Sequence, residues 1–159
     1  MYKQTPIINF SDLKNDIRLE LTVVGYQFPD EPLDNWCLLN ATISQENNVF
    51  VVNDPAIEAV DLVSILDWFK CIHNRQLPRY ATLTFIEPCI EFNFIACCES
   101  YVRIAISLNN EMQPDFKFKQ FGITLENCNL CFDLNLNDFN LIISNLESLV
   151  QLYPVRRKN

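Results

Sequence analysis

One amphipathic segment, from Asp54 to Ile72, most constrains what this chain can fold into. Its apolar residues recur at helical spacing and form one stripe: Leu62, Ile65, Leu66, Phe69 and Ile72. Runs of alternating apolar and polar residues, typical of β-strands, lie on both sides of it. We therefore expect a helix here that covers one face of a sheet.

The strands are predicted from two-residue alternation. They are expected over residues 7–10, 17–28, 36–44, 49–52, 81–86, 89–96, 101–108, 121–125 and 130–136. Asp54-Pro55 is expected to break the strand before it and to lead into the helix, because proline lacks an N–H group. A second amphipathic helix is predicted to begin at an Asn137 cap and to end before Pro154.

This order of elements contains no repeated strand–helix alternation, which a parallel sheet would require. The sequence predicts an α+β fold: a largely antiparallel curled sheet or two-sheet sandwich of about eight strands, with two amphipathic helices packed on it. The length of 159 residues suits a single globular domain, with residues 1–16 as a loosely attached N-terminal segment.

The chain is acidic, with a formal net charge of −8. Three of its basic residues, Arg156, Arg157 and Lys158, are together near the end, and the rest carries nine basic and twenty acidic residues, a net charge of −11. An acidic body repels phosphate backbones, so we expect no nucleic-acid partner and favour a basic protein. Acidity that only keeps the protein in solution is the simpler alternative.

The cysteine pattern and the N-terminal sequence indicate a cytoplasmic protein. Seven cysteines are an odd number, and most have apolar neighbours, which is typical of buried thiols in a reducing compartment: Cys37, Cys71, Cys89, Cys97, Cys98, Cys128 and Cys131. No apolar run has the length of a signal peptide core or a membrane span, so no membrane association is expected.

Cys128 and Cys131 have the C-x-x-C spacing of zinc and dithiol sites. They fall in a strand pattern with no helix directly behind them to lower a thiol pKa. Cys97 and Cys98 could add two ligands, but adjacent strand residues point to opposite faces. We therefore expect buried structural cysteines, and neither a metal nor a cofactor.

His73 is the only histidine, near the end of the predicted helix, where a cation is favourable. A small hydrolase that pairs His73 with a cysteine is the enzymatic alternative. Glu87 and Glu91 would share a strand face and could do acid–base chemistry, but Pro88 interrupts the strand. Glu87 is instead expected to form a structural ion pair with Arg156.

Several landmarks, taken in order, resemble the WapI-type immunity proteins. They are Gly25-Tyr26-Gln27-Phe28-Pro29, Asp34-Asn35-Trp36-Cys37-Leu38, Asp54-Pro55 before a helix that reaches Trp68-Phe69, Phe85-Ile86-Glu87-Pro88 with Ile90 and Phe92, and Tyr153-Pro154-Val155-Arg156. The resemblance spans the chain from about Gly25 to Arg156. In place of the hydroxyl residues that usually open the helix in this family, the chain has Glu58-Ala59, so the helix cap is not evident.

The resemblance implies a small bacterial cytoplasmic protein that binds and inactivates the toxin end of a contact-dependent growth-inhibition protein. Inhibition would be by occlusion, without enzymatic turnover, and the basic groove of a nuclease toxin would suit an acidic inhibitor. A protein–protein adaptor with a non-toxic partner would use the same surface. The partner-binding candidates are acidic residues in loops: Asp30, Glu31, Asp34, Glu111 and Asp115.

Overall fold

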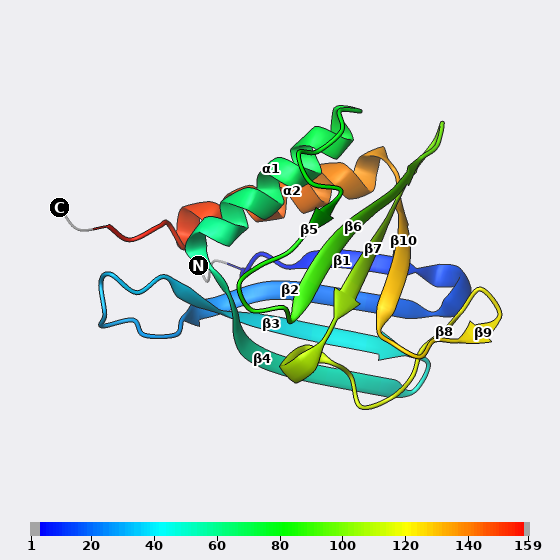
Figure 1. Cartoon of the computed structure of the whole chain (residues 1–159), viewed down its shortest axis with the longest axis horizontal. Helices are drawn as coiled ribbons and strands as arrows, with labels where there is room; N and C mark the ends of the chain where they lie inside the picture. Colours follow the sequence, from blue (N-terminus) through cyan, green and yellow to red (C-terminus); the bar gives the residue numbers. More distant parts are fainter. Residues whose placement is uncertain (1–3, 158–159) are drawn as a thin grey trace.

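The computed structural model describes residues 4–157 and has an α+β architecture, with ten strands and two α-helices in that range (Figure 1). The strands are β1 (Ile8–Asp12), β2 (Ile17–Tyr26), β3 (Trp36–Gln45), β4 (Asn48–Glu58), β5 (Thr82–Leu83), β6 (Ile90–Cys97), β7 (Val102–Leu108), β8 (Lys119–Gln120), β9 (Ile123–Thr124) and β10 (Asn129–Leu134). The helices are α1 (Ala59–His73) and α2 (Leu136–Leu152), with short 3₁₀ turns η1 (Leu13–Asn15) and η2 (Asn110–Met112). The predicted fold class is confirmed.

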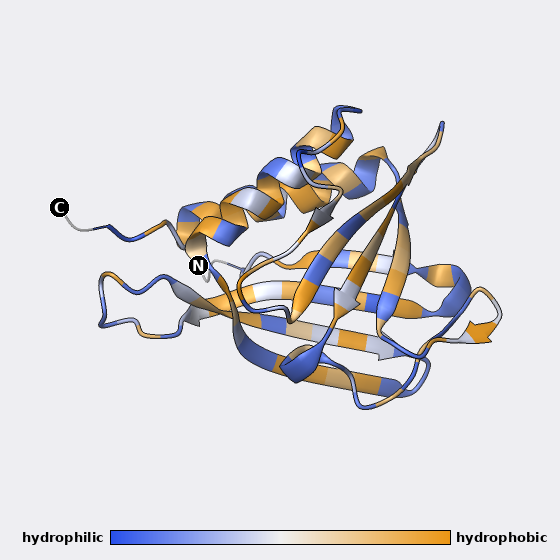
Figure 2. Ribbon diagram, viewed as in Figure 1, coloured by the Kyte–Doolittle hydropathy of each residue, from blue (hydrophilic) through white to orange (hydrophobic). Residues whose placement is uncertain are grey.

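The first sheet has the order β1-β2-β3-β4, and every pair is antiparallel. Its strands alternate apolar and polar residues (Figure 2), and the inward residues of β2, such as Ile17 and Leu19, are buried. The expected loose attachment of residues 1–16 does not hold for β1, because Ile8 and Phe10 are buried in the core. Residues 1–3 lie outside the described range.

The prediction that Asp54-Pro55 ends a strand was wrong. β4 continues through Pro55 to Glu58, with an irregularity in its register opposite Cys37 to Leu39. Proline is tolerated because β4 is the last strand of its sheet, where an N–H group can be missing without breaking the ladder. The helix therefore begins later than expected, at Ala59.

The start of α1 is satisfied without a hydroxyl cap. The Glu58 N–H donates to Asp61 Oδ2 over 2.8 Å, and the Ala59 N–H donates to the Asn35 carbonyl over 2.9 Å. Asp61 also places negative charge at the positive end of the helix dipole. The first turn of α1 is thus tied to the residue that precedes β3.

The second sheet has the order β10-β7-β6-β5 and is also antiparallel. The strand expected over 81–86 is reduced to β5, because Ile86 is 78 % exposed and Pro88 follows. The strand expected over 121–125 is instead part of a small hairpin, β8–β9, whose turn is Phe121-Gly122. Both turn residues have positive φ, +57° and +73°, as a two-residue hairpin turn requires.

The two helices lie side by side above the sheets (Figure 1) and are joined by an ion pair of 3.3 Å between Lys70 and Glu147. The second helix begins two residues earlier than predicted. Asn135, and not Asn137, is its cap: Asn135 Oδ1 accepts from the Asp138 N–H over 2.9 Å, and Asp138 Oδ2 accepts from the Asn135 N–H over 2.8 Å.

Candidate functional site

The acidic loop, residues 27–35, connects β2 to β3 and carries three of the predicted contact residues. Asp30 and Glu31 are exposed, and Asp34 is half-buried. Two turns shape the loop: the Glu31 N–H donates to the Phe28 carbonyl over 3.1 Å, and the Asp34 N–H donates to the Glu31 carbonyl over 3.0 Å. Asp34 Oδ1 accepts from the Trp36 N–H over 2.9 Å. Among the described residues, no ion pair engages Asp30 or Glu31, so the charges of these two exposed carboxylates are available to a partner.

Arg156 fixes the acidic loop from the other end of the chain. Its guanidinium donates to three loop carbonyls, those of Phe28 at 3.1 Å, Pro29 at 3.0 Å, and Asp34. The guanidinium carbon also lies 3.8 Å from the centre of the Tyr26 ring, a cation–π contact. The Arg156 guanidinium thus holds the backbone of the loop and pairs with none of its carboxylates.

Two further contacts fasten the segment around Arg156. The Tyr26 hydroxyl donates to the Pro154 carbonyl over 2.5 Å. The Asn35 side chain accepts from the Arg156 N–H over 2.6 Å and donates to the Arg156 carbonyl over 3.1 Å, as a neighbouring strand would. The predicted Glu87–Arg156 ion pair does not form, because Arg156 is committed to backbone carbonyls of the acidic loop.

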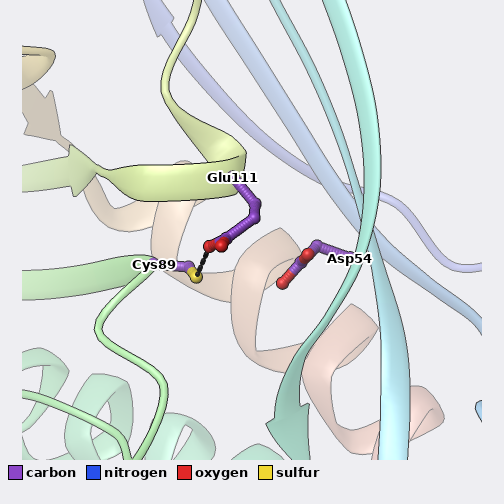
Figure 3. Close-up of side chains that lie close together, drawn as sticks. All are labelled: Asp54, Cys89 and Glu111. Atoms are coloured by element: carbon purple, nitrogen blue, oxygen red, sulfur yellow. Dashed lines mark hydrogen bonds between the residues drawn. The ribbon is translucent and has the colours of Figure 1, made fainter.

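A second group of acidic side chains lies where η2 meets β4 (Figure 3). The ligand atoms of Asp54, Cys89 and Glu111 all lie within 4.8 Å of one another. The Cys89 thiol donates to Glu111 Oε2 over 3.3 Å. Burial and this hydrogen bond raise the pKa of Cys89 to about 12, so the thiol keeps its proton at neutral pH.

The carboxylates of this group repel one another. The pKa of Asp54 is raised, first by burial and then by Glu111, with a further contribution from Glu87. Two carboxylates and a thiol are fewer protein ligands than the four of a structural zinc site, and a metal ion would have to displace the proton of the Cys89 thiol. The arrangement is better suited to meeting a positive side chain, which would relieve the repulsion.

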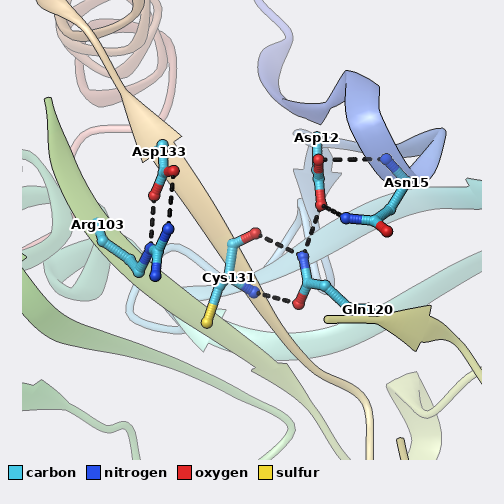
Figure 4. A network of polar contacts seen from close by, with 6 residues as sticks. All are labelled: Asp12, Asn15, Arg103, Gln120, Cys131 and Asp133. Carbon is cyan, nitrogen blue, oxygen red and sulfur yellow. Dashed lines mark hydrogen bonds and ion pairs between the residues drawn. The ribbon is translucent and has the colours of Figure 1, made fainter. Parts of the chain in front are cut away.

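A polar network joins η1, β7, β8 and β10 (Figure 4). It lies beside a hollow of about 450 Å³. Arg103 and Asp133 form a two-pronged pair with distances of 2.7 and 3.0 Å. Gln120, which is 2 % exposed, joins β8 to β10 and to Asp12. Arg103 and Asp133 neutralise each other, and the Asp12 carboxylate accepts hydrogen bonds from Asn15 and Gln120, so we assign the network a structural role.

The comparisons with known proteins decide the family. Residues 10–154 match the immunity protein WapI-like family. The chain belongs to this family. No curated protein and no solved structure matches it.

In this WapI-like immunity protein, the two predicted partner-binding residues outside the acidic loop, Glu111 and Asp115, do not form one group with it. Glu111 lies in η2, close to Asp54 of β4, while Asp115 is exposed on the loop that follows η2. Asp54 and Cys89 were missed, because nothing in their local sequence indicates that β4 and the start of β6 converge. Cys37, Cys89 and Cys128 are buried, as predicted, whereas Cys97 is exposed.

The histidine–cysteine hydrogen bond on which the enzymatic alternative was based is not present among the described residues of this WapI-like protein. The ring of His73 packs against Phe139, with 5.3 Å between their centres. Within residues 4–157, no thiol forms a hydrogen bond with His73.

Neither helix in that range combines the length and hydropathy needed to cross a membrane.

Replacing Arg156 by methionine tests whether this side chain holds the acidic loop. Methionine keeps much of the apolar stem but removes the bonds to Phe28, Pro29 and Asp34, so we expect a loss of about 1–3 kcal/mol in the free energy of unfolding. Amide exchange measured by mass spectrometry should become faster over residues 27–35. The matched control is Arg79→Met, because Arg79 also lies over a tyrosine ring but donates no hydrogen bond to a described residue. Equal exchange in the two variants would contradict the role given to Arg156.

Proposed function

We propose that this chain is an immunity protein that binds a cognate toxin domain in the cytoplasm and blocks it by occlusion, without turnover. Family membership supports a toxin as the partner. The observation that carries the assignment of the surface is the acidic loop, whose exposed carboxylates stand on a backbone fixed by Arg156. A loop that is already ordered loses little conformational entropy when it binds.

The charge of the chain indicates a basic partner. The net charge is −8, and the carboxylates of Asp30 and Glu31 form no ion pair with a described residue, so the protein would attract a positive surface and associate with it quickly. A toxin with a basic groove for RNA or DNA has such a surface. We therefore propose a nuclease domain as the target, with the acidic loop in the place of substrate phosphates.

Co-expression with the protein encoded beside this chain, taken as the candidate source of the toxin domain, tests the proposal. We expect the chain to restore growth of cells that produce the toxin domain and to form a one-to-one complex with it. Normal growth arrest in the presence of the folded chain, with no complex in size-exclusion chromatography, would refute the immunity role for that pair.

The double variant Asp30→Asn/Glu31→Gln tests the surface. Removing two charges without changing side-chain size should slow association and weaken binding at least tenfold, with a smaller dependence of the rate on salt. Stopped-flow association over a salt series measures this.

The matched control is Asp67→Asn/Glu99→Gln, which removes the same charge at exposed positions on α1 and on the β6–β7 turn. If the two double variants slow association equally, only net charge matters, and the acidic loop is not the contact.

A further inference from the structure

The two main sheets have four outer strands, β1, β4, β5 and β10. Three of them are short or already have partners along their outer edge. β5 has only two residues. The edge of β10 is filled by Gln120, whose side chain accepts from the Cys131 N–H over 3.0 Å and donates to the Cys131 carbonyl over 2.9 Å. β1 lies against β10, and the Asn145 side chain donates to the carbonyl of Ile7, just before it, over 2.9 Å. Such devices prevent another strand from adding to a sheet.

The fourth edge, β4, is long and open. It has eleven residues and pairs only with β3. Within residues 4–157, no backbone–backbone hydrogen bond from outside the sheet reaches residues 48–57. Every second residue of an edge strand directs its N–H and C=O groups away from the sheet, so β4 offers unpaired donors and acceptors.

The first half of β4, residues 48–53, lacks the features that block edge pairing. Its sequence, Asn-Val-Phe-Val-Val-Asn, contains no charge and no proline. Val49 and Val51 are 59 % and 60 % exposed on the outer face, while Phe50 and Val52 pack against the core. The blocking features come only afterwards, with Asp54, Pro55 and the register irregularity.

The carboxylates of Asp54 and Glu111 lie where this open half ends. Asp54 is also near Glu87, and no described basic side chain forms an ion pair with any of the three carboxylates. A strand that paired with residues 48–53 and continued past Asn53 would bring its next side chains to this negative group. A lysine or arginine there would remove the mutual repulsion of the carboxylates.

We propose that residues 48–53 of β4 bind an extended segment of a basic protein partner, which adds a fifth strand to the first sheet. Alternate apolar side chains of the segment pack on Val49 and Val51, and a basic side chain meets Asp54 and Glu111. The identification of the partner as the toxin domain rests on the proposed function. A second copy of this chain is a poorer occupant, because it carries the same net charge of −8.

The binding site is tested first with a peptide of defined composition, a synthetic seven-residue peptide of alternating valine and lysine. We expect the peptide to slow amide exchange over residues 48–53 and to shift the NMR signals of those residues. The same peptide with a central proline, which cannot pair along its whole length, should bind at least tenfold more weakly.

The variant Val51→Lys places a charge on the exposed edge and should weaken peptide binding at least tenfold. Its matched control is Val63→Lys, the same change at an exposed position of α1, which should bind as the wild type does. Equal binding by both variants, equal binding of the proline peptide, or protection outside residues 48–53 would overturn the proposal. Dimerisation of the free chain that Val51→Lys abolishes would also overturn it, in favour of a second copy.

Growth rescue and toxin binding, measured for the wild type and for Val51→Lys, separate this inference from the proposed function. If the wild type and Val51→Lys both restore growth and bind the toxin domain equally, the immunity role stands and the edge-strand site for the toxin is wrong. If neither restores growth while the peptide results are as expected, the toxin assignment fails and the edge-strand site stands.

Discussion

Replacing Phe69 by alanine should lower the free energy of unfolding by about 3–5 kcal/mol. Phe69 lies on α1 and is fully buried. Its ring centre is 6.0 Å from that of Phe10 in β1, 5.7 Å from that of Phe92 in β6 and 6.5 Å from that of Phe139 in α2. The side chain thus joins both sheets to both helices, and the cavity left by its removal cannot be closed from one side.

Urea unfolding followed by tryptophan fluorescence measures this loss. Phe69→Leu provides a milder change that should keep the fold and cost less than the alanine variant. The control is Phe121→Ala, since Phe121 is 59 % exposed at the hairpin turn and should cost less than about 1 kcal/mol. A loss below about 1 kcal/mol for Phe69→Ala would mean that this ring is not central to the core.

Replacing Gln120 by methionine should cost about 3 kcal/mol, the second-largest effect that we expect. Methionine fills a similar volume, but the N–H and C=O groups of Cys131 lose their partner inside the protein. Leaving buried polar groups unpaired costs about 1–3 kcal/mol each. Gln113→Met is the control, because the Gln113 side chain is exposed.

The same substitution should change the pH dependence of stability through Asp12. Burial raises the pKa of Asp12, but hydrogen bonds from Gln120 and Asn15 outweigh burial, and the folded pKa is below the ordinary 3.8. A lowered folded pKa gives stability that is present above pH 3.8 and lost as the pH falls through the folded pKa.

Without Gln120 the pKa of Asp12 should rise, and part of that stability should be absent at neutral pH. The difference in unfolding free energy between wild type and Gln120→Met should therefore be smaller at pH 3 than at pH 7. Urea titrations at the two pH values measure it, and a difference that grows on acidification would contradict the assigned bond.

Alternation and helical spacing were sufficient to place most elements. β2, β3 and β7 were predicted within about two residues, because each has one face in the core. The errors occurred where position in the sheet overrides local preference. Pro55 lies within a strand only because that strand is an edge, and Phe121 occupies a turn position that usually holds asparagine or glycine.

The candidate site was predictable in part. Proline and acidic residues between two strands indicated the loop that contains Asp30 and Glu31. The residue that orders this loop, Arg156, was assigned to Glu87, because no local pattern reports a contact between residues more than 120 positions apart. The convergence of Asp54 and Glu111 was beyond sequence reasoning for the same reason.

The long-range hydrogen bonds of Asn145, Pro154 and Arg156 also limit the order in which contacts can form during synthesis. They join residues separated by 138, 128 and 121 positions, respectively. During translation, the first sheet emerges from the ribosome well before α2 can pack on β1, so this contact must wait until residues 136–152 have been made.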